Sequence, residues 1–355
     1  MSDQSLKGVM IGAGFFAQFQ AEAWRRISGI EITAVADAVT ERAEQFAAQW
    51  QIAGAYANVE EMLDREKPDF VDIVTRPESH VALTRLAAER GIHVICQKPM
   101  APTWEDCLAM VNVCAASNVR LMIHENWRWQ PWFREVKRLV DTGMFGTPFY
   151  ASFVMRNGDG WGPEPYQVQP YFREMPRLLV YEMVVHFLDT FRFLMGEITS
   201  VYCRLRQLNP AIRGEDCMLA QFTFADGAQG LIDANRVTGR PFPSKTFGDF
   251  TLEGERAKIR VTPQGEIFLT DYGCDERAHE FVSPEQGYKG DSVYAVQQHC
   301  VSCLRAAQRM RRRRVFEDGR HRPGLLRIVG SGPDRRPKNF EIGISFVVPP
   351  SGGKA

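Results

Sequence analysis

Short apolar runs alternate with helix-like segments through the first third of the chain. The runs are VMIGAG, EITAVAD, DFVDIVT, HVICQKP and VRLMIHEN, the last ending at Asn126. Between them, apolar residues recur at the spacing of one helix face, as in TERAEQFAAQW and HVALTRLAAERG. Strands that alternate with helices are typical of βαβ units. The pattern therefore predicts an α/β fold that begins with a doubly wound parallel sheet.

The pattern changes after Asn126, where longer segments alternate apolar and polar residues. FYASFVMR, ITSVYCRLRQ and FGDFTLEG are examples, and Asp226-Gly227 and Gln264-Gly265 mark turns between such segments. One helical segment, residues 177–196, interrupts the series. We expect a C-terminal α+β domain with an open, mainly antiparallel sheet. Because one apolar face of that sheet needs cover, we also expect a homo-dimer or homo-tetramer formed through it.

These patterns divide the chain into three parts. We expect the first domain over residues 1–126 and a second domain, for substrate and oligomerisation, over residues 127–308. Residues 309–355 form an atypical basic tail rich in arginine, proline and glycine, in which neither a helical nor a strand period persists. We expect this tail to be disordered or irregular, and our hypothesis is a reading frame shifted from about Arg309. Nucleic-acid binding by the tail is an alternative.

Composition and charge narrow the class of protein. The 355 residues carry a formal net charge of +0, which gives no overall attraction to nucleic acid or membrane. No apolar stretch approaches the roughly 20 residues of a membrane-spanning helix, and MSDQSLKG lacks the apolar core of a signal peptide. Among eight scattered cysteines, Cys300 and Cys303 form a single CxxC, interpreted as two buried thiols on one helix. We expect a cytoplasmic protein without a metal site.

A glycine turn joins the first predicted strand to the first helix. Gly12 and Gly14 match two glycines of the dinucleotide fingerprint, and Ala17 stands at its third position, where alanine also occurs. Backbone N–H groups there, and at Phe15 and Phe16, would approach a pyrophosphate at the positive end of the helix. A tight corner without a ligand is the alternative.

Asp37 ends the second predicted strand, about twenty residues beyond the glycine turn. A carboxylate there binds the ribose hydroxyls of NAD and repels the 2′-phosphate of NADP. Ala38 and Val39 follow it, so no arginine comes directly after it to hold that phosphate. The turn, the spacing and the carboxylate together predict a Rossmann domain that binds NAD, with NADP less favoured. The alternative is an aspartate that only ends a strand.

Two further segments carry candidate catalytic residues. Lys98 follows the strand HVICQ, at the sheet edge where a nicotinamide would lie, and its ammonium would stabilise a developing alkoxide. Glu182 and His186 are spaced i,i+4 on the predicted helix, which also holds Asp189, so a carboxylate would orient a general base. The alternative for Lys98 is a solvated surface lysine, and the alternative for His186 is an interfacial histidine without a catalytic role.

Together these segments resemble the Gfo/Idh/MocA family. GAGFFA, the strand end at Asp37, TRPESH, HVICQKPMA and YEMVVHFLD follow one another in the family's order, and the resemblance covers the chain from about Lys7 to about Gln308. The resemblance implies a Rossmann domain followed by an open-faced, mainly antiparallel sheet that often builds oligomers. It also implies NAD(P)-linked oxidation or reduction of sugars, cyclitols and related polyols.

The resemblance assigns roles to particular residues. Lys98 resembles the lysine that contacts the reacting oxygen, His186 the histidine that takes or gives its proton, and Glu182 the aspartate that accompanies it. The residues implied near the cofactor are Thr75, Pro77, His80, Gln97 and Asn126. Three departures stand out: Gln97 replaces a glutamate, Glu182 replaces an aspartate, and the tail after Gln308 differs from the family's usual ending.

Aromatic and basic residues gather after Asn126. We expect Arg128, Trp161 and Tyr171 to contact substrate, because planar apolar faces stack on sugar rings and arginine donates to hydroxyls or a carboxylate. The expected reaction is hydride transfer between nicotinamide and a hydroxyl or carbonyl carbon of a sugar, cyclitol or sugar acid. The alternatives are an NAD-dependent glycosidase on the same scaffold and a non-catalytic NAD-binding sensor.

Overall fold

The computed structural model describes residues 5–239, 244–284 and 286–318, and these divide into two compact units. The first unit contains the described residues up to His124 together with those from Val296 onward. The second unit runs from Glu125 to Ala295. This division differs from the expected second domain of residues 127–308, because the long C-terminal helix returns to the first unit.

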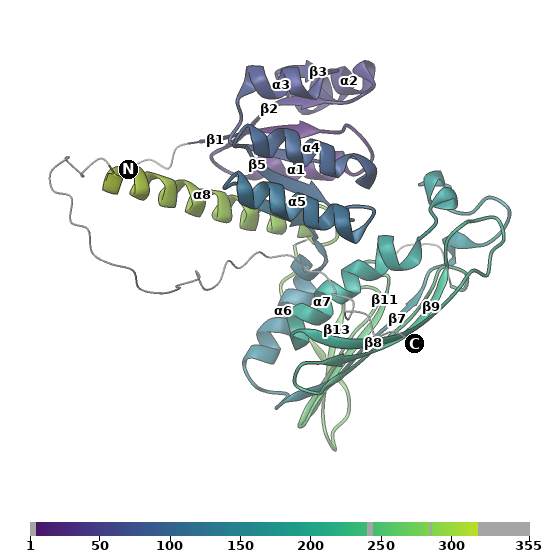
Figure 1. Cartoon of the computed structure of the whole chain (residues 1–355). Coiled ribbons are helices and arrows are strands. Elements are labelled where there is room, and N and C mark those ends of the chain that lie inside the picture. The colour runs from purple at the N-terminus through teal and green to yellow at the C-terminus, as the bar shows by residue number, and fades with distance from the viewer. Residues whose placement is uncertain (1–4, 240–243, 285, 319–355) are drawn as a thin grey trace, which may run out of the picture. The chain divides into compact units, whose positions relative to one another are not determined.

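The first unit is built on a six-stranded sheet in the order β3-β2-β1-β4-β5-β6 (Figure 1). All neighbouring strands are parallel, as the βαβ pattern predicted. The central strands β4 and β5 are buried along their whole length, which explains their nearly unbroken apolar sequences. The strands are β1 (Leu6–Ile11), β2 (Ile30–Ala36), β3 (Gly54–Tyr56), β4 (Phe70–Ile73), β5 (His93–Gln97) and β6 (Leu121–His124).

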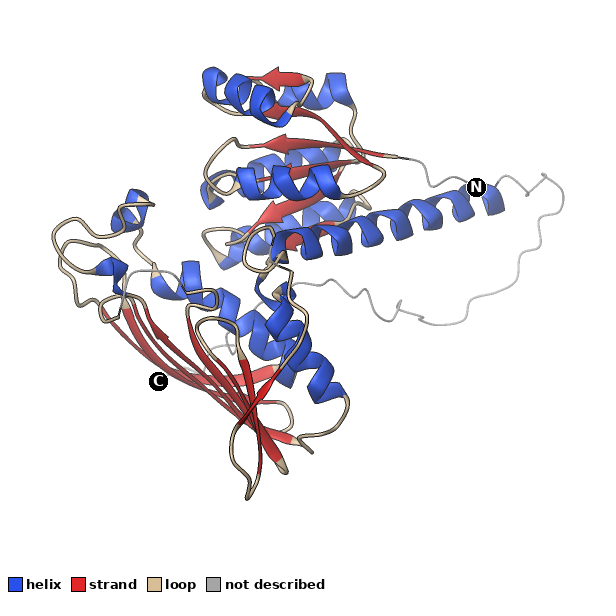
Figure 2. Cartoon of the chain, turned by 180° about the vertical axis from the view of Figure 1, so that it is seen from behind, coloured by secondary structure: helices blue, strands red, loops and turns tan. Residues whose placement is uncertain are grey.

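Helices lie on both sides of this sheet (Figure 2). They are α1 (Ala17–Arg26), α2 (Thr40–Trp50), α3 (Val59–Glu66), η1 (Pro77–Ser79), α4 (His80–Glu89), α5 (Trp104–Ala116) and α8 (Ser292–Asp318). The last of these comes from the far end of the described chain. Its Gln297 donates to the carbonyl of Gln20, 3.2 Å away, and its Arg305 donates to the carbonyl of Ser28, also 3.2 Å away. These contacts attach α8 to α1 and to the loop that follows it.

The second unit contains an eight-stranded sheet in the order β14-β13-β12-β11-β7-β10-β9-β8. Its paired neighbours are antiparallel except β7 and β10, which run parallel. This confirms the expected α+β architecture. The strands are β7 (Pro148–Arg156), β8 (Ile198–Arg206), β9 (Cys217–Phe224), β10 (Gln229–Asn235), β11 (Gly248–Gly254), β12 (Ala257–Val261), β13 (Ile267–Asp271) and β14 (Arg277–His279).

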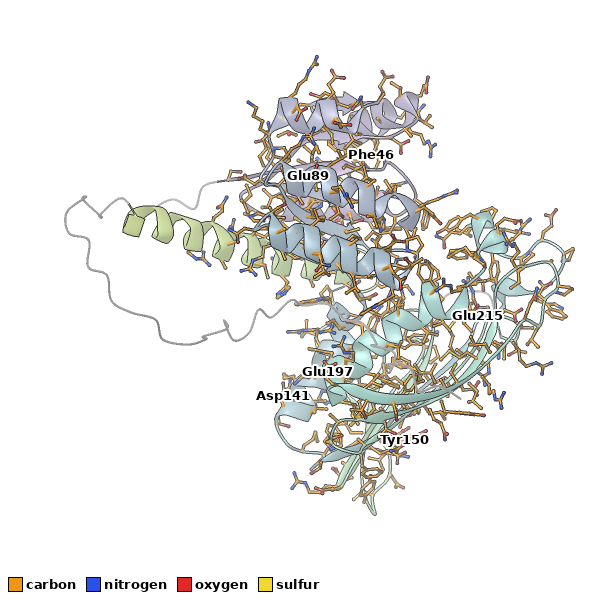
Figure 3. The ribbon with its side chains drawn as sticks, in the orientation of Figure 1. Phe46, Glu89, Asp141, Tyr150, Glu197 and Glu215 are labelled. Atoms are coloured by element: carbon orange, nitrogen blue, oxygen red, sulfur yellow. The ribbon has the colours of Figure 1, made fainter. Side chains whose placement is uncertain are left out.

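One face of the second sheet forms the core of this unit. Helices α6 (Pro131–Asp141) and α7 (Val185–Met195) contribute to that core, where Phe153 on β7 stacks on Phe187 with ring centroids 4.3 Å apart. Residues on the other face alternate with the core residues. Tyr150, labelled in Figure 3, belongs to this outer set and is half-buried. Four short elements complete the unit: η2 (Trp127–Trp129), η3 (Gly158–Gly160), η4 (Pro170–Glu174) and the π-helix η5 (Leu179–Val184).

Two predicted elements differ from the structure. Residues 177–196 were expected to form one regular helix, but the π-helix Leu179–Val184 precedes α7. An irregular chain was expected from residue 309, but the backbone of α8 continues as helix to Asp318. Arginine favours helix, so the arginine run is compatible with this extension. The rest of the expected tail, residues 319–355, lies outside the described residues.

All eight cysteines are free. Cys300 and Cys303 both lie on α8, as expected; Cys300 is buried and Cys303 is half-buried. In the described part of the chain, none of the helices has the length and apolar character needed to cross a membrane.

Candidate active site

The glycine turn between β1 and α1 has the geometry of an anion-binding turn. Gly12 has φ +103°, and a Cβ on it would lie 2.5 Å from the carbonyl oxygen of Val74, so this position requires glycine. A Cβ on Gly14 would meet nothing within 4 Å. Helix α1 begins directly afterwards with no side-chain cap at Phe16 and no acidic residue in its first turn. Its first N–H groups are therefore available to a phosphate.

The carboxylate of Asp37 lies beside this turn. Its Oδ2 accepts a hydrogen bond from the backbone N–H of Ala13 at 2.9 Å, and its Oδ1 accepts one from Val39 at 2.9 Å. Each carboxylate oxygen retains a second acceptor site for a ribose hydroxyl. Arg42 on α2 also lies near, with Nε 3.7 Å from Oδ1. The open space over Gly14, the uncapped helix and this carboxylate together fit a dinucleotide.

His80 connects the segments that follow β4 and β5. It is fully buried, with Nδ1 3.0 Å from the carbonyl oxygen of Met100 and Nε2 3.2 Å from that of Thr75. Burial lowers the pKa of His80. Sequence reasoning expected His80 to line the cofactor. Both ring nitrogens instead face backbone carbonyls, so His80 supports the Thr75 loop from inside.

The other residues of that loop lie nearer to the surface. Thr75 has its hydroxyl 2.6 Å from that of Ser79 and is half-buried, and Pro77 begins the short helix η1. Both follow the carboxyl end of β4, the sheet edge where ligands bind in this type of fold. Their expected contact with the cofactor remains a prediction.

Gln97 and Lys98 end β5 at the same sheet edge. Gln97 is buried, and its Oε1 accepts a hydrogen bond from the backbone N–H of Lys98 at 2.8 Å. Lys98 itself is half-buried. Gln97 was expected to contact the cofactor, but the structure uses its side chain to hold the backbone of its neighbour.

The second unit contains a histidine–carboxylate pair. His186, near the start of α7, is 4 % exposed, and its Nδ1 lies 2.7 Å and 2.8 Å from the two carboxylate oxygens of Glu125. The same carboxylate accepts a hydrogen bond from the backbone N–H of Trp127 at 2.8 Å. Trp127 stacks on the imidazole with centroids 4.4 Å apart and planes 22° apart. These contacts fix both the tautomer and the plane of the ring.

Glu125 is a residue of this candidate site that sequence reasoning missed. The expected partner of His186 was Glu182, on the basis of i,i+4 spacing in a regular helix. Glu182 lies in the π-helical turn η5, where that spacing no longer applies, and the carboxylate that accepts the hydrogen bond from Nδ1 is that of Glu125. Glu125 lies 61 residues before His186 and has no helical relation to it. Its position directly after β6 was the only signal in the sequence.

Glu182 nevertheless belongs to the same cluster. It is 8 % exposed, and its charge and that of Glu125 both act on the phenol of Tyr288. Burial, more than these charges, raises the pKa of Tyr288. Two carboxylates, an imidazole and a phenol therefore gather in the interior of the second unit.

The aromatic stack beside His186 ends at a buried ammonium. Phe247 stacks on the far side of Trp127 with centroids 5.0 Å apart, and the Nζ of Lys289 lies 3.8 Å from the Phe247 ring centroid. This ammonium also donates to the carbonyls of Ser244 and Lys245 at 2.9 Å each. Burial lowers the pKa of Lys289 to about 7. The stack holds the indole of Trp127 rigidly against His186.

The remaining predicted residues occupy separate places in the second unit. Arg128 donates from Nε and an Nη to the buried carboxylate of Asp189 at 2.5 Å, so this guanidinium is engaged within the fold. The amide of Asn126 is also internal and donates to the hydroxyl of Ser292 at 2.8 Å. Trp161, which follows η3, and Tyr171, which lies in η4, are 60 % and 37 % exposed, respectively. Tyr171 contacts the ring of Phe172, with centroids 4.7 Å apart, and its hydroxyl accepts a hydrogen bond from Gln169 at 3.1 Å.

Two family models match most of the chain. The model described as "Oxidoreductase family, NAD-binding Rossmann fold" covers residues 6–125, and the GFO/IDH/MocA C-terminal domain covers residues 133–260. The chain belongs to the Gfo/Idh/MocA oxidoreductase family. Membership confirms the predicted resemblance, the NAD-binding Rossmann domain and the oxidoreductase class.

Named relatives of this Gfo/Idh/MocA chain include two D-apiose dehydrogenases. The protein from Rhizobium rhizogenes is 32% identical over 86% of this chain and 89% of its own length. That from Paraburkholderia graminis is 34% identical over 84% of this chain and 80% of its own length. A solved oxidoreductase from Agrobacterium radiobacter, in complex with NAD+, L-tartaric acid and magnesium, superposes with a TM-score of 0.77 at 31% identity. That match covers 85% of this chain and 89% of the other.

Proposed function

We propose that this protein is an NAD-dependent dehydrogenase that oxidises a CH–OH group of a sugar, cyclitol or sugar acid. The observation that carries the proposal is the Glu125–His186 pair, because a histidine held at Nδ1 by a carboxylate has Nε2 available as a general base. The two relatives named D-apiose dehydrogenase make D-apiose the first candidate substrate.

The first unit supplies the residues that would hold NAD. Backbone N–H groups of the turn at Gly12 and Gly14 and of the α1 N-terminus would bind the pyrophosphate, and Asp37 would bind the ribose hydroxyls. When bound, NAD accepts the hydride that leaves the substrate carbon. Asp37 disfavours a 2′-phosphate, although Arg42 beside it makes a direct comparison with NADP worthwhile.

Three residues of the chain would act on the substrate oxygen and its proton. We assign to His186 the removal of the hydroxyl proton at Nε2, while Glu125 stabilises the imidazolium that forms. Lys98 would donate to the same oxygen and stabilise its negative charge. Glu182 would bind a neighbouring hydroxyl, since its carboxylate belongs to the His186 cluster.

Two exposed aromatic residues would form part of the substrate surface. Trp161 and Tyr171 are exposed, and exposed aromatic rings of this kind can stack on sugars. Arg128 is a weaker candidate than the sequence suggested, because Asp189 already engages its guanidinium.

We also propose a homo-oligomer that forms through the outer face of the C-terminal sheet, and a reducing cytoplasmic location. The first is supported by exposed apolar residues on that sheet, including Tyr202 and Leu219. The second is supported by eight free cysteines in one chain.

The function can be tested by following NADH absorbance with purified protein. D-apiose, aldoses, inositols and uronates would each be offered with NAD and, in parallel, with NADP. We expect NAD-dependent oxidation of one of these classes, and His186→Asn should reduce kcat by about 10²–10⁴-fold while NAD still binds. Release of a free aglycone from a glycoside without net NADH would indicate the glycosidase instead. NAD binding without turnover of any substrate would indicate a sensor.

A further inference from the structure

The first unit contains a fully buried carboxylate that is connected to the Lys98 segment by hydrogen bonds. Asp72 lies on β4 and is 0% exposed. It accepts a hydrogen bond from Nε1 of Trp24 at 2.7 Å and from Nε2 of Gln20 at 3.0 Å and 3.1 Å, both on α1. Burial raises the pKa of Asp72 to about 7, against the effect of these two donors. A buried carboxylate is costly to retain, and none of the roles assigned so far uses this one.

A chain of side-chain amides connects Asp72 to Lys98. Gln20 uses Nε2 on Asp72, so its Oε1 faces Gln97, whose Nε2 donates to it at 3.4 Å. Gln97 then has Oε1 facing the backbone N–H of Lys98, which donates to it at 2.8 Å. In each of these hydrogen bonds the donor therefore lies on the Lys98 side and the acceptor on the Asp72 side. The carboxylate at one end fixes the orientation of both amides.

We propose that Asp72 is a positioning residue that acts through Gln20 and Gln97 to hold the backbone of Lys98 in place for the reaction. This inference rests on the proposed function, in which Lys98 stabilises the reacting oxygen. The series Asp72–Gln20–Gln97 is called the relay below. It also accounts for Gln97, where the family resemblance led us to expect glutamate. A glutamate at position 97 would have no N–H to donate to Gln20. In this chain the carboxylate is that of Asp72, which is connected to the Lys98 backbone through the side chains of Gln20 and Gln97.

The relay predicts how the side-chain amides reorient in the Asp72→Asn variant. The side-chain oxygen of the new asparagine accepts from Trp24, which directs its NH2 group toward Gln20. Gln20 must then turn its oxygen to that group and its NH2 group to Gln97. Gln97 turns in response and presents its own NH2 group to the N–H of Lys98. Two donors then face each other, so the hydrogen bond to Lys98 is lost.

A second substitution should restore that bond. In the Asp72→Asn, Gln97→Glu double variant, the carboxylate at position 97 accepts from both the Lys98 N–H and the Gln20 NH2 group. Gln20 accepts from the asparagine with its oxygen, and the asparagine accepts from Trp24. Every donor has an acceptor again. Gln97→Glu alone instead places two carboxylates around one amide in a buried site, which is unfavourable.

The test uses the full chain at pH 8.5, above the pKa of Asp72. The charge of Asp72 acts on the thiols of Cys96 and Cys300, and burial raises the pKa of Cys96. Both cysteines are kept in every variant. Hydrogen exchange of the Lys98 amide, read by NMR, should accelerate by at least about tenfold in Asp72→Asn and return to the wild-type rate in the double variant. On the substrate found above, kcat should fall by about ten- to a hundredfold and recover in the same way, with the affinity for NAD unchanged.

A matched pair of glutamines supplies the control. Gln20→Met breaks the relay in its middle, whereas Gln297→Met removes an equally buried amide that donates only to the backbone carbonyl of Gln20. Only Gln20→Met should accelerate exchange at Lys98, and this comparison remains informative if Asp72→Asn does not fold.

Two results would overturn the relay: a protected Lys98 amide in Asp72→Asn or Gln20→Met, or a double variant that exchanges as fast as Asp72→Asn. The exchange readout needs no substrate. If the wild-type protein oxidises no sugar while the exchange pattern holds, the proposed function fails and the relay stands.

Discussion

At the scale of single residues, the proposed chemistry depends on the carboxylate that orients His186. We predict that Glu125→Gln lowers kcat by about a hundredfold, because the amide keeps the size of the side chain but cannot stabilise a charged imidazole. A suitable control is Glu135→Gln, since Glu135 pairs with His279 at 2.7 Å in another part of the same unit. Steady-state kinetics of both variants would check this.

Glu182→Gln belongs in the same series, because spacing alone had assigned the orienting role to Glu182. We expect a smaller loss than for Glu125→Gln, expressed mainly in KM, since Glu182 makes no hydrogen bond with Nδ1 of His186 in the structure. If Glu182→Gln lost more kcat than Glu125→Gln, the assignment of Glu125 would be wrong.

The residues that sequence reasoning found and missed differ in a physical way. The sequence placed Gly12, Gly14 and Asp37 together at one turn, as the structure does, because their positions depend on local backbone geometry and on a fixed spacing along one βαβ unit. Glu125 was missed because its contact with His186 exists only after folding. The burial of His80, with both ring nitrogens near backbone carbonyls, cannot be read from a short motif, and its contact with the cofactor stays a prediction.

At the scale of elements, the turn between β1 and α1 allows ligand binding to be separated from stability. We predict that Gly14→Ala weakens NAD binding by at least about tenfold with little change in Tm, because the added Cβ meets no protein atom but enters the space of the pyrophosphate. Calorimetric titration with NAD and thermal unfolding would measure the two effects.

Gly12→Ala provides the contrasting case at the same turn. Its φ of +103° is unfavourable for alanine, and the Cβ would lie 2.5 Å from the carbonyl oxygen of Val74. We therefore expect a loss of roughly 1–3 kcal/mol in the free energy of unfolding. Equal losses of stability in both variants would show that Gly14 is structural as well.

Helical periodicity predicted the second unit's helix but not its register. Apolar spacing across residues 177–196 indicates helix, yet a π-helical turn keeps a similar apolar face while displacing each residue relative to the next turn. The position of Glu182 relative to His186 depends on that displacement. Periodicity therefore located the helix that carries His186. Glu125 could be recognised as the partner of this histidine only from the three-dimensional structure.

At the scale of the whole molecule, the sequence pattern predicted the type of both sheets, but not strand β3 or the parallel pairing of β7 with β10. Repeated βαβ units predicted the parallel pairing of the first sheet, and turn pairs such as Asp226-Gly227 predicted antiparallel neighbours in the second. The affiliation of α8 could not be predicted, because a helix at the end of a chain has no neighbour in sequence to fix its place. Its hydrogen bonds with Gln20 and Ser28 agree with the assignment of its residues from Val296 onward to the first unit.

The outer face of the second sheet carries the remaining prediction. Tyr202 on β8 pairs with Gln221 on β9, so it shares a face with Leu219 that is opposite the core residues Ala220 and Phe222. Tyr202 is 59% exposed and Leu219 is 51% exposed, although large apolar side chains favour burial. We expect a dimer or tetramer in sedimentation experiments.

Leu219→Glu should shift that assembly toward monomer, because burying an unpaired carboxylate in an apolar interface is unfavourable. Val282→Glu is the control, since Val282 is 95% exposed and lies outside the strands of this sheet. Sedimentation velocity of the three proteins at equal concentration would show whether only Leu219→Glu dissociates. A wild-type monomer, or equal dissociation in both variants, would mean that the sheet face does not bind a second copy. The exposed residues would then have to be explained by a different partner.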